Sequence, residues 1–230
     1  MMSTPTLDID RDHMKTRQAL VTDAIRLAIL QGKFRPGDKL DQTDLAQELN
    51  VSRSPVREAL SILTAEDLVT HYPHRGTVVK ERSVTELEEL LFIRKLLEGA
   101  AARRAAPIMT DAQLQNLANI IEEAEQSDDV KRVLHLNNMF HSSIYSAYHQ
   151  PYLVEHIQQM RNKVAPYNRL YLDGIGQKRA AWDDHRRIYA ACLARDGVAA
   201  ADETCLHLDR VFEGVISAMS DGIKPTAGKP

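Results

Sequence analysis

Two arginines and two serines stand close together in the stretch VSRSPVREAL, at residues 51–60. Arg53 and Arg57 are four residues apart, so a helix here would place both guanidinium groups on one face. Ser52 or Ser54 can cap such a helix. A helix end that presents arginines and hydroxyls suits phosphate oxygens and guanine edges. The alternative is an ordinary surface helix whose charges are solvated.

Three histidines in the second half of the chain lie on predicted inward faces of three helices. His185 shares its face with Trp182, His207 lies among small and apolar residues, and His141 follows Asn137 by one helical turn. Each histidine alone could be a hydrogen-bonded core residue. Three on the inward faces of three helices could instead hold a metal ion, because facing helices build metal sites in bundle cores. Imidazole suits zinc, nickel, copper or iron, and three imidazoles leave positions open for water or a ligand.

Arg94 interrupts an apolar helical stripe between Leu90 and Leu97. It could be the exposed partner of Glu98, four residues on, in a pair worth only about 0.3–0.5 kcal/mol. It could also point inward and bind a ligand carboxylate through two parallel hydrogen bonds. We favour the inward arginine.

The arginine-bearing helix belongs to a recognisable order of elements within residues 16–82. The predicted elements are helices at 16–31 and 42–50, the arginine-bearing helix, and extended runs at 68–72 and 77–80. Only a tight turn separates the second helix from the arginine-bearing one, which is helix-turn-helix spacing. The turn between the extended runs, PHRG at 73–76, gives a β-hairpin wing with a basic tip. This order predicts a winged helix-turn-helix, whose second paired helix enters the major groove of DNA.

The rest of the chain reads as helices alone. Capping boxes at Ser83–Glu86 and Thr110–Gln113 start the first two helices, and Ser127 is expected to cap the third. Three more helices are predicted over 151–171, 176–195 and 198–219. The expected fold class is mainly α, an N-terminal winged helix-turn-helix followed by an all-α bundle of about six helices.

This reading divides the chain into two domains and two tails. We expect flexible tails at 1–15 and 223–230, a winged helix-turn-helix domain at 16–82, and an all-α helical domain at 83–222.

Composition limits the class of protein. The chain has 230 residues, 43% of them hydrophobic and 27% charged, and a net charge of -3. Any contact with DNA must therefore come from a local basic surface. Cys192 and Cys205 form no CxxC motif, which favours a reduced, cytoplasmic protein with two buried thiols. No signal peptide or membrane-spanning run is seen, so we expect no membrane partner.

The N-terminal stretches AIRLAILQGKFRPGDKL, DLAQELNVSRSPVREALSIL and LVTHYPHRGTVV resemble the DNA-binding domain of GntR-type bacterial transcription regulators. The resemblance covers about residues 17–80. Thr43 stands where some members carry an arginine, so no contact is carried over there. The resemblance implies DNA contacts by Ser52, Arg53, Ser54 and Arg57 of the helix and by His74, Arg75 and Gly76 of the wing.

The stretches FIRKLLEGAAARRAA, NxxFH, DDHRRIYAACLARD and CLHL are similar to the FCD ligand-binding domain of the FadR branch of the same family. In FCD domains three histidines and a carboxylate or amide often hold a divalent metal. The resemblance implies the ligands Asn137, His141, His185 and His207, with zinc expected first and nickel or manganese as alternatives. Many members have aspartate at the first position. Because asparagine is neutral, the metal is expected to bind less tightly here or to be held by three histidines and water.

Together these features predict a ligand-responsive repressor that binds a palindromic double-stranded DNA operator. One recognition helix per chain implies a homodimer, because a two-fold operator needs two such helices. A metal beside Arg94 suits a small organic acid, whose carboxylate reaches the metal while Arg94 or Tyr145 holds its other end.

Three alternatives are compatible with parts of this pattern. The regulator could sense an acyl-type ligand without metal, as some FadR-branch members respond to acyl-coenzyme A. A metal-dependent hydrolase would also use three histidines, but the sequence has no HExxH or comparable cluster. A protein-binding helical module would not need inward histidines.

Overall fold

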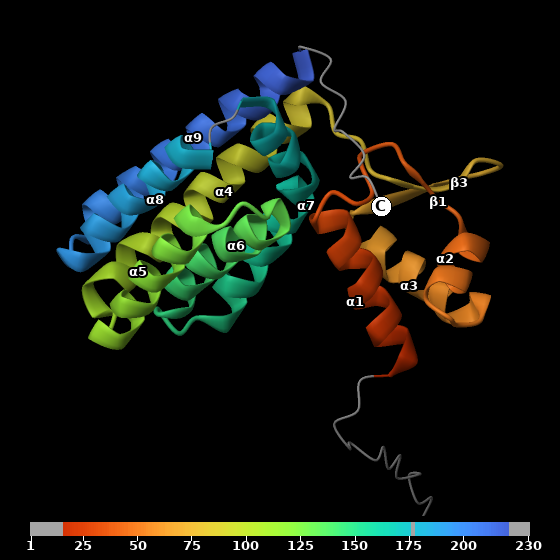
Figure 1. The fold of residues 1–230 in the computed structure, drawn as a ribbon, viewed down its shortest axis with the longest axis horizontal. Helices are drawn as coiled ribbons and strands as arrows, with labels where there is room; N and C mark the ends of the chain where they lie inside the picture. Colours follow the sequence, from red (N-terminus) through yellow and green to blue (C-terminus); the bar gives the residue numbers. More distant parts are fainter. Residues whose placement is uncertain (1–15, 176–177, 221–230) are drawn as a thin grey trace, which may run out of the picture.

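The computed structural model describes residues 16–175 and 178–220, except for the side chains of residues 169–175 and 178–181. The tails predicted at 1–15 and 223–230 lie outside the described residues. Figure 1 shows a long helical bundle beside a smaller N-terminal body. The elements in chain order are α1 (Arg17–Leu30), β1 (Lys39–Leu40), α2 (Gln42–Glu48), α3 (Arg53–Ala65), β2 (Val69–Tyr72), β3 (Gly76–Val79), α4 (Val84–Ala105), the 3-10 helix η1 (Ala106–Ile108), α5 (Asp111–Gln126), α6 (Val130–Ser146), α7 (Pro151–Ile175), α8 (Lys178–Leu193) and α9 (Gly197–Ser220).

The N-terminal body is the predicted winged helix-turn-helix. The side chain of Thr16 caps α1, which buries Val21, Ile25 and Ile29 at helical spacing. Asn50, in the turn between α2 and α3, has a φ of 51°, a left-handed conformation that asparagine tolerates. α3 packs its apolar back onto α1, so its other face is left for solvent or a partner.

The wing contains a strand that sequence reasoning missed. β2 and β3 form the predicted hairpin, and β1 pairs with the outer side of β3, so that the antiparallel sheet has the order β1-β3-β2. Two residues are too few for an alternating pattern to reveal β1. His74 and Gly76, with φ values of 67° and 84°, form the hairpin turn.

The bundle consists of α4 to α9, as predicted, and both capping boxes are present. One predicted cap is wrong. Ser127 is the C-cap of α5, and α6 begins three residues later, at Val130. The N-cap of α6 is Asp129, whose side chain accepts a hydrogen bond from the backbone N–H of Lys131. Of the two thiols expected to be buried, Cys192 is buried and Cys205 only partly so. No helix among the described residues is both long and apolar enough to cross a bilayer.

Arg82 joins the N-terminal body to the bundle. Its backbone N–H donates to the hydroxyl of Tyr167 at 2.7 Å, and its Nε donates to the backbone oxygen of Lys163 at 3.1 Å, both on α7. Its guanidinium also donates to the backbone oxygen of Asp67, 2.6 Å away, just after α3. One buried arginine thus links helix α7 of the bundle to the segment that follows α3 in the N-terminal body.

Candidate metal centre, effector cavity and nucleic-acid interface

Three histidines from three helices meet inside the bundle, as predicted, and form what we call the histidine cluster. His141 comes from α6, His185 from α8 and His207 from α9, and all three are buried. One ligand atom from each lies within 4.8 Å of the others. Zn–N bonds are about 2.0–2.1 Å long, so this spacing is close to what three ligands of one ion need. Asn137 Oδ1 lies beside the cluster, 2.9 Å from His185 Nε2.

Neighbouring side chains fix the orientation of two of the rings. Nδ1 of His141 lies 3.2 Å from the hydroxyl of Tyr145, one turn further along α6. Nδ1 of His207 lies 3.5 Å from Oδ2 of Asp184. In both rings the opposite nitrogen, Nε2, remains for a further partner.

The surroundings keep these imidazoles neutral. Burial, and then the positive charge of Arg161, lower the pKa of His141 well below its ordinary value. Burial also lowers the pKa of His207, although Asp184 opposes this shift. Neutral imidazole is the form that binds metal. Three imidazoles and an amide oxygen are a donor set that fits a divalent ion such as zinc, nickel or manganese.

Arg94 does pair with Glu98, but the pair is buried rather than exposed. Nε of Arg94 donates to Glu98 Oε1 at 2.6 Å, and Glu98 is 0% exposed. Arg161 of α7 donates to the other carboxylate oxygen at 3.1 Å. Burial alone would raise the pKa of Glu98, but the charges of Arg94 and Arg161 outweigh it and hold that pKa below its ordinary value. The exposed-pair interpretation of Arg94 is therefore wrong.

A cavity of about 50 Å³ adjoins the histidine cluster. Nε of Arg161 is buried and has no hydrogen-bond partner among the described residues. Tyr145, predicted to hold an effector, is not among the described residues that line the cavity, and its hydroxyl donates to Glu98 instead. The lining consists of Arg94, Val133, Leu134, Asn137, Asn138, His141, Arg161, Asn168, Trp182, His185, His207, Leu208 and Val211.

Sequence reasoning missed Arg161 and Asp184 and gave Glu98 only a surface role. A signal existed for Arg161, which follows the buried Ile157 by one turn and so occupies an inward position of α7. Asp184 lies in the charged run DDHRR and has no such signal.

The predicted DNA-contacting residues of α3 share its exposed face. Ser52, Arg53, Ser54 and Arg57 are exposed, while Val56 on the same helix is fully buried. Ser52 does occupy the N-cap position of α3, but its side chain makes no capping hydrogen bond, so the predicted cap is not formed. Both serines are exposed beside the arginines.

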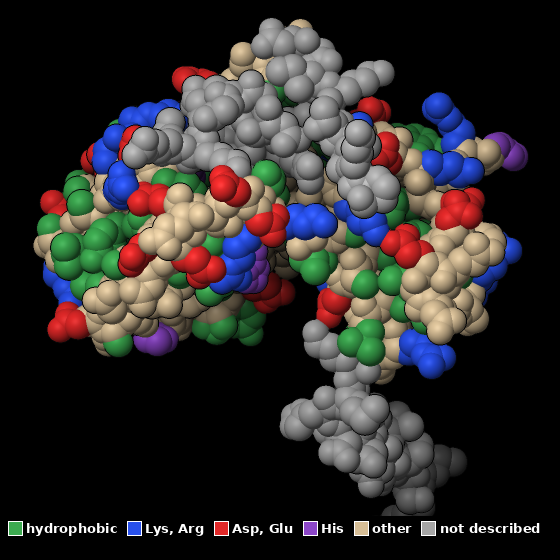
Figure 2. Space-filling view, in the orientation of Figure 1, with side chains coloured by type: hydrophobic (Ala, Val, Ile, Leu, Met, Phe, Trp, Pro, Cys, Tyr) green, Lys and Arg blue, Asp and Glu red, His purple; other side chains and the backbone are tan. Residues whose placement is uncertain are grey.

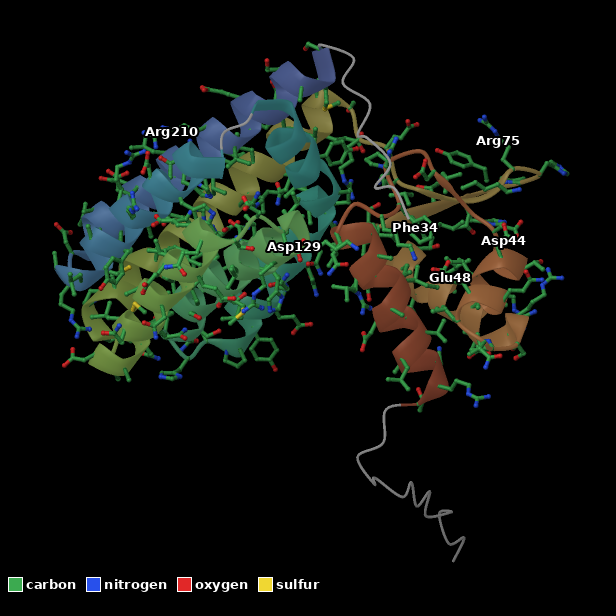
Figure 3. All side chains as sticks on the ribbon, in the orientation of Figure 1. Phe34, Asp44, Glu48, Arg75, Asp129 and Arg210 are labelled. Carbon is green, nitrogen blue, oxygen red and sulfur yellow. The ribbon has the colours of Figure 1, made fainter. Side chains whose placement is uncertain are left out.

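The wing carries the other predicted contacts. His74 and Arg75 are exposed at the hairpin turn, and Gly76 is half-buried. Figure 2 shows basic side chains and a histidine at the outer end of the wing, and Figure 3 shows Arg75 on the side away from the bundle. Acidic Asp44 and Glu48 lie on the neighbouring α2, and Glu48 is paired with Lys33.

Comparison with known proteins identifies both halves of the chain. Residues 17–79 match the model for bacterial regulatory proteins of the gntR family, and residues 89–210 match the FCD domain. The regulator LutR of Bacillus subtilis strain 168 is 32% identical over 218 residues, covering 82% of this chain and 96% of LutR. This protein belongs to the GntR family.

Other relatives agree with this assignment. The transcriptional repressor RspR of Escherichia coli K12 is 29% identical over 197 residues, covering 83% of this GntR-family chain and 85% of RspR. Two solved structures share the fold. E. coli McbR/YncC has a TM-score of 0.79 at 24% identity, covering 92% of this chain and 100% of that one. A GntR regulator from Rhodococcus sp. RHA1 has a TM-score of 0.77 at 26% identity, covering 89% and 99%. The predicted family and fold class are confirmed, and the chain is a ligand-responsive GntR-family transcription regulator with an FCD domain.

Proposed function

We propose that this GntR-family protein is a cytoplasmic repressor that binds a palindromic operator as a homodimer and responds to a small organic acid held beside a divalent metal ion. Residues 16–82 form the DNA-binding domain and residues 83–222 the effector-binding and dimerisation domain. The observation that carries the proposal is one cavity that combines the histidine cluster with two arginines, in a chain with an exposed arginine-bearing helix. The repressor role is supported by the relative RspR.

DNA reading is assigned to α3 and the wing. Arg53 and Arg57 project from the exposed face of α3, where guanidinium groups can form paired hydrogen bonds with guanine in the major groove. Ser52 and Ser54 stand at the N-terminal end of the same helix, where phosphate oxygens are favoured. His74, Arg75 and Gly76 of the wing are assigned to contacts with the same duplex.

The metal is assigned to His141, His185, His207 and Asn137. When bound, it would supply positive charge and open coordination positions for a ligand oxygen. Zinc suits this donor set, with nickel or manganese as alternatives. The neutral state of the His141 and His207 rings and the position of Asn137 Oδ1 support the assignment.

The effector is assigned from the charge and size of the cavity. Arg94 and Arg161 carry two positive charges against one negative charge on Glu98, which leaves the group at +1 before any metal binds. The unpaired Nε of Arg161 can donate to a carboxylate. A cavity needs about 10–15 Å³ to hold one water molecule, so a cavity of about 50 Å³ has room for only a few non-hydrogen atoms. This size favours a small organic acid over a long acyl chain.

The homodimer is assigned to an exposed apolar stripe on α4. Phe92 and Leu96 lie one turn apart and are 64% and 58% exposed, and Ile93 beside them is 40% exposed. Contiguous exposed apolar side chains mark interaction sites on soluble proteins. A second copy of the chain, which the operator symmetry requires, is the partner that we assign to this stripe.

Helix α7 provides a route from the cavity to the DNA-binding domain. Arg161 lines the cavity, while Lys163 and Tyr167, further along the same helix, contact Arg82. A ligand that binds more tightly when α7 is in one position would favour the arrangement of the DNA-binding domains that goes with that position. The size of this shift in the equilibrium is set by the difference between the two binding affinities.

A thermal-shift screen tests the proposal. Mono- and dicarboxylic acids and sugar acids are compared with acyl compounds, each with and without zinc, nickel or manganese. The expected result is metal-dependent stabilisation by a small acid, lost in Arg94→Ala and kept in Lys95→Ala. Lys95 is the matched control, because it follows Arg94 on α4 but pairs with Asp209 outside the cavity. Hits limited to acyl compounds and indifferent to metal and to Arg94 would contradict the proposal.

A further inference from the structure

A line of hydrogen-bonded side chains leads from α4 to the histidine cluster. The hydroxyl of Tyr145 donates to Oε2 of Glu98 at 2.7 Å and lies 3.2 Å from Nδ1 of His141. These three residues are 2%, 0% and 1% exposed, respectively. Because solvent does not reach these side chains, the hydrogen bonds among them determine which atom carries each hydrogen.

Only one arrangement of hydrogens satisfies every group in this line. Glu98 lies between the guanidinium groups of Arg94 and Arg161, so it is a carboxylate and can only accept hydrogen bonds. The hydroxyl of Tyr145 must then give its hydrogen to Glu98, and it turns a lone pair toward His141. Nδ1 of His141 must carry the hydrogen that this lone pair accepts. A neutral ring in that form has an unprotonated Nε2, which is the form that a metal needs.

Asp184 acts on His207 in the same way, without a hydroxyl between them. Nδ1 of His207 lies 3.5 Å from Oδ2 of Asp184, and the other carboxylate oxygen is bound by Arg187 and Arg210. Asp184 can also only accept, so the hydrogen of His207 is on Nδ1. Two carboxylates on different helices thus select the same tautomer in two histidines.

We propose that Glu98, acting through Tyr145, and Asp184 are positioning residues that make His141 and His207 bind a metal through Nε2. This role rests on the proposed metal site and deepens it. It replaces the effector contact predicted for Tyr145, whose hydroxyl already has two partners. Groups that orient metal-binding histidines in this way fix the tautomer and the ring direction, and their loss typically lowers metal affinity about 10–100-fold.

The test compares Tyr145→Phe with Tyr148→Phe. Tyr148 is the matched control, because its hydroxyl accepts a hydrogen bond from the exposed Arg104 instead of touching the cluster. The first measurement is the ¹⁵N spectrum of the histidine rings in chelator-treated protein, with the His141 signals assigned from a His141→Gln variant. The second is a zinc titration against a competing chelator. We expect His141 in the Nδ1–H form in wild type and in Tyr148→Phe, and a mixture of tautomers with about 10–100-fold weaker zinc binding in Tyr145→Phe.

The two measurements separate this role from the metal proposal itself. If His141 of the wild type carries its hydrogen on Nε2, the arrangement is wrong whether or not zinc binds. If the tautomer is as expected but zinc affinity is equal in both variants, the positioning role is overturned. A wild type that binds no zinc, nickel or manganese overturns the metal site. The tautomer of His141 in that protein still shows whether the proposed arrangement of hydrogen bonds is right. Should Tyr145→Phe fail to fold, Asp184→Asn and the His207 signals give the same comparison.

Discussion

Oδ1 of Asn137 lies 2.9 Å from Nε2 of His185, at the edge of a cluster of three buried histidines. An amide oxygen at this position can approach a metal, but it brings no negative charge to offset the ion. Arg94 and Arg161 make the surroundings more positive still. The affinity of the site for a cation is therefore expected to respond strongly to the charge of residue 137.

We predict that Asn137→Asp binds zinc more tightly than wild type and that Asn137→Ala binds it less tightly. A carboxylate about 4 Å from a charge contributes up to about 4 kcal/mol at an effective dielectric constant of about 20, and desolvation of the aspartate offsets part of this. We expect a net gain of about tenfold in affinity. The measurement is a competition titration with a chelator on protein purified without an affinity tag. Asn119→Asp, on the exposed face of α5, is the control. Equal affinities for all four proteins would remove Asn137 from the ligand set.

Asp67 should make stability depend on acid pH. Burial would raise its pKa, but the hydrogen bond from Lys80 and the charge of Arg82 outweigh burial and hold the pKa below 3.8. A carboxyl whose folded pKa is depressed stabilises the fold above its unfolded pKa and loses this contribution as pH falls through the folded value. We predict that Asp67→Asn is less stable than wild type at pH 6 and that the difference shrinks as pH falls below about 3.8. Urea unfolding at a series of pH values measures it, and a difference that is constant with pH would contradict it.

Arg53→Ala and Arg57→Ala should each weaken operator binding without unfolding the protein. Both side chains are exposed, so their loss leaves the packing of α3 unchanged. A paired contact to guanine is worth about 1–3 kcal/mol of discrimination, and the loss should be larger on the operator than on unrelated DNA. Arg132→Ala, an exposed arginine of the bundle, is the control. Fluorescence anisotropy at two salt concentrations measures the affinities. Unchanged operator affinity in both α3 variants would refute the assigned interface.

The sequence predicted what local chemistry determines and missed what long-range contacts determine. The capping boxes at Ser83 and Thr110 were found because their partners are three residues away. Ser127 was misplaced because Asp129, two residues later, is an equally good local cap. The group of Glu98 and Arg161 could not be found, since the two residues are 63 positions apart and meet only when α4 and α7 pack together. The histidine cluster could be predicted because each histidine occupies an inward position on its own helix.

Phe92→Glu should weaken the homodimer while leaving the protomer folded. Phe92 is 64% exposed in the single chain, so a charged side chain at this position costs the protomer little. In a dimer closed across the α4 stripe, the same glutamate would be buried next to its symmetric copy. Burial of a phenylalanine side chain is worth about 1.5–3 kcal/mol, so the dissociation constant should rise about tenfold or more.

Sedimentation at micromolar concentration measures this change, with Tyr152→Glu as the control. Tyr152 is 79% exposed but lies on α7 and is not part of the α4 stripe. Binding to DNA gives an independent reading, because a weakened dimer should lose affinity for a two-fold operator and keep its affinity for a single half-site. If Phe92→Glu remains as dimeric as wild type, the interface lies elsewhere on the bundle. If the wild type itself is a monomer that binds a single half-site, the symmetric assembly is wrong.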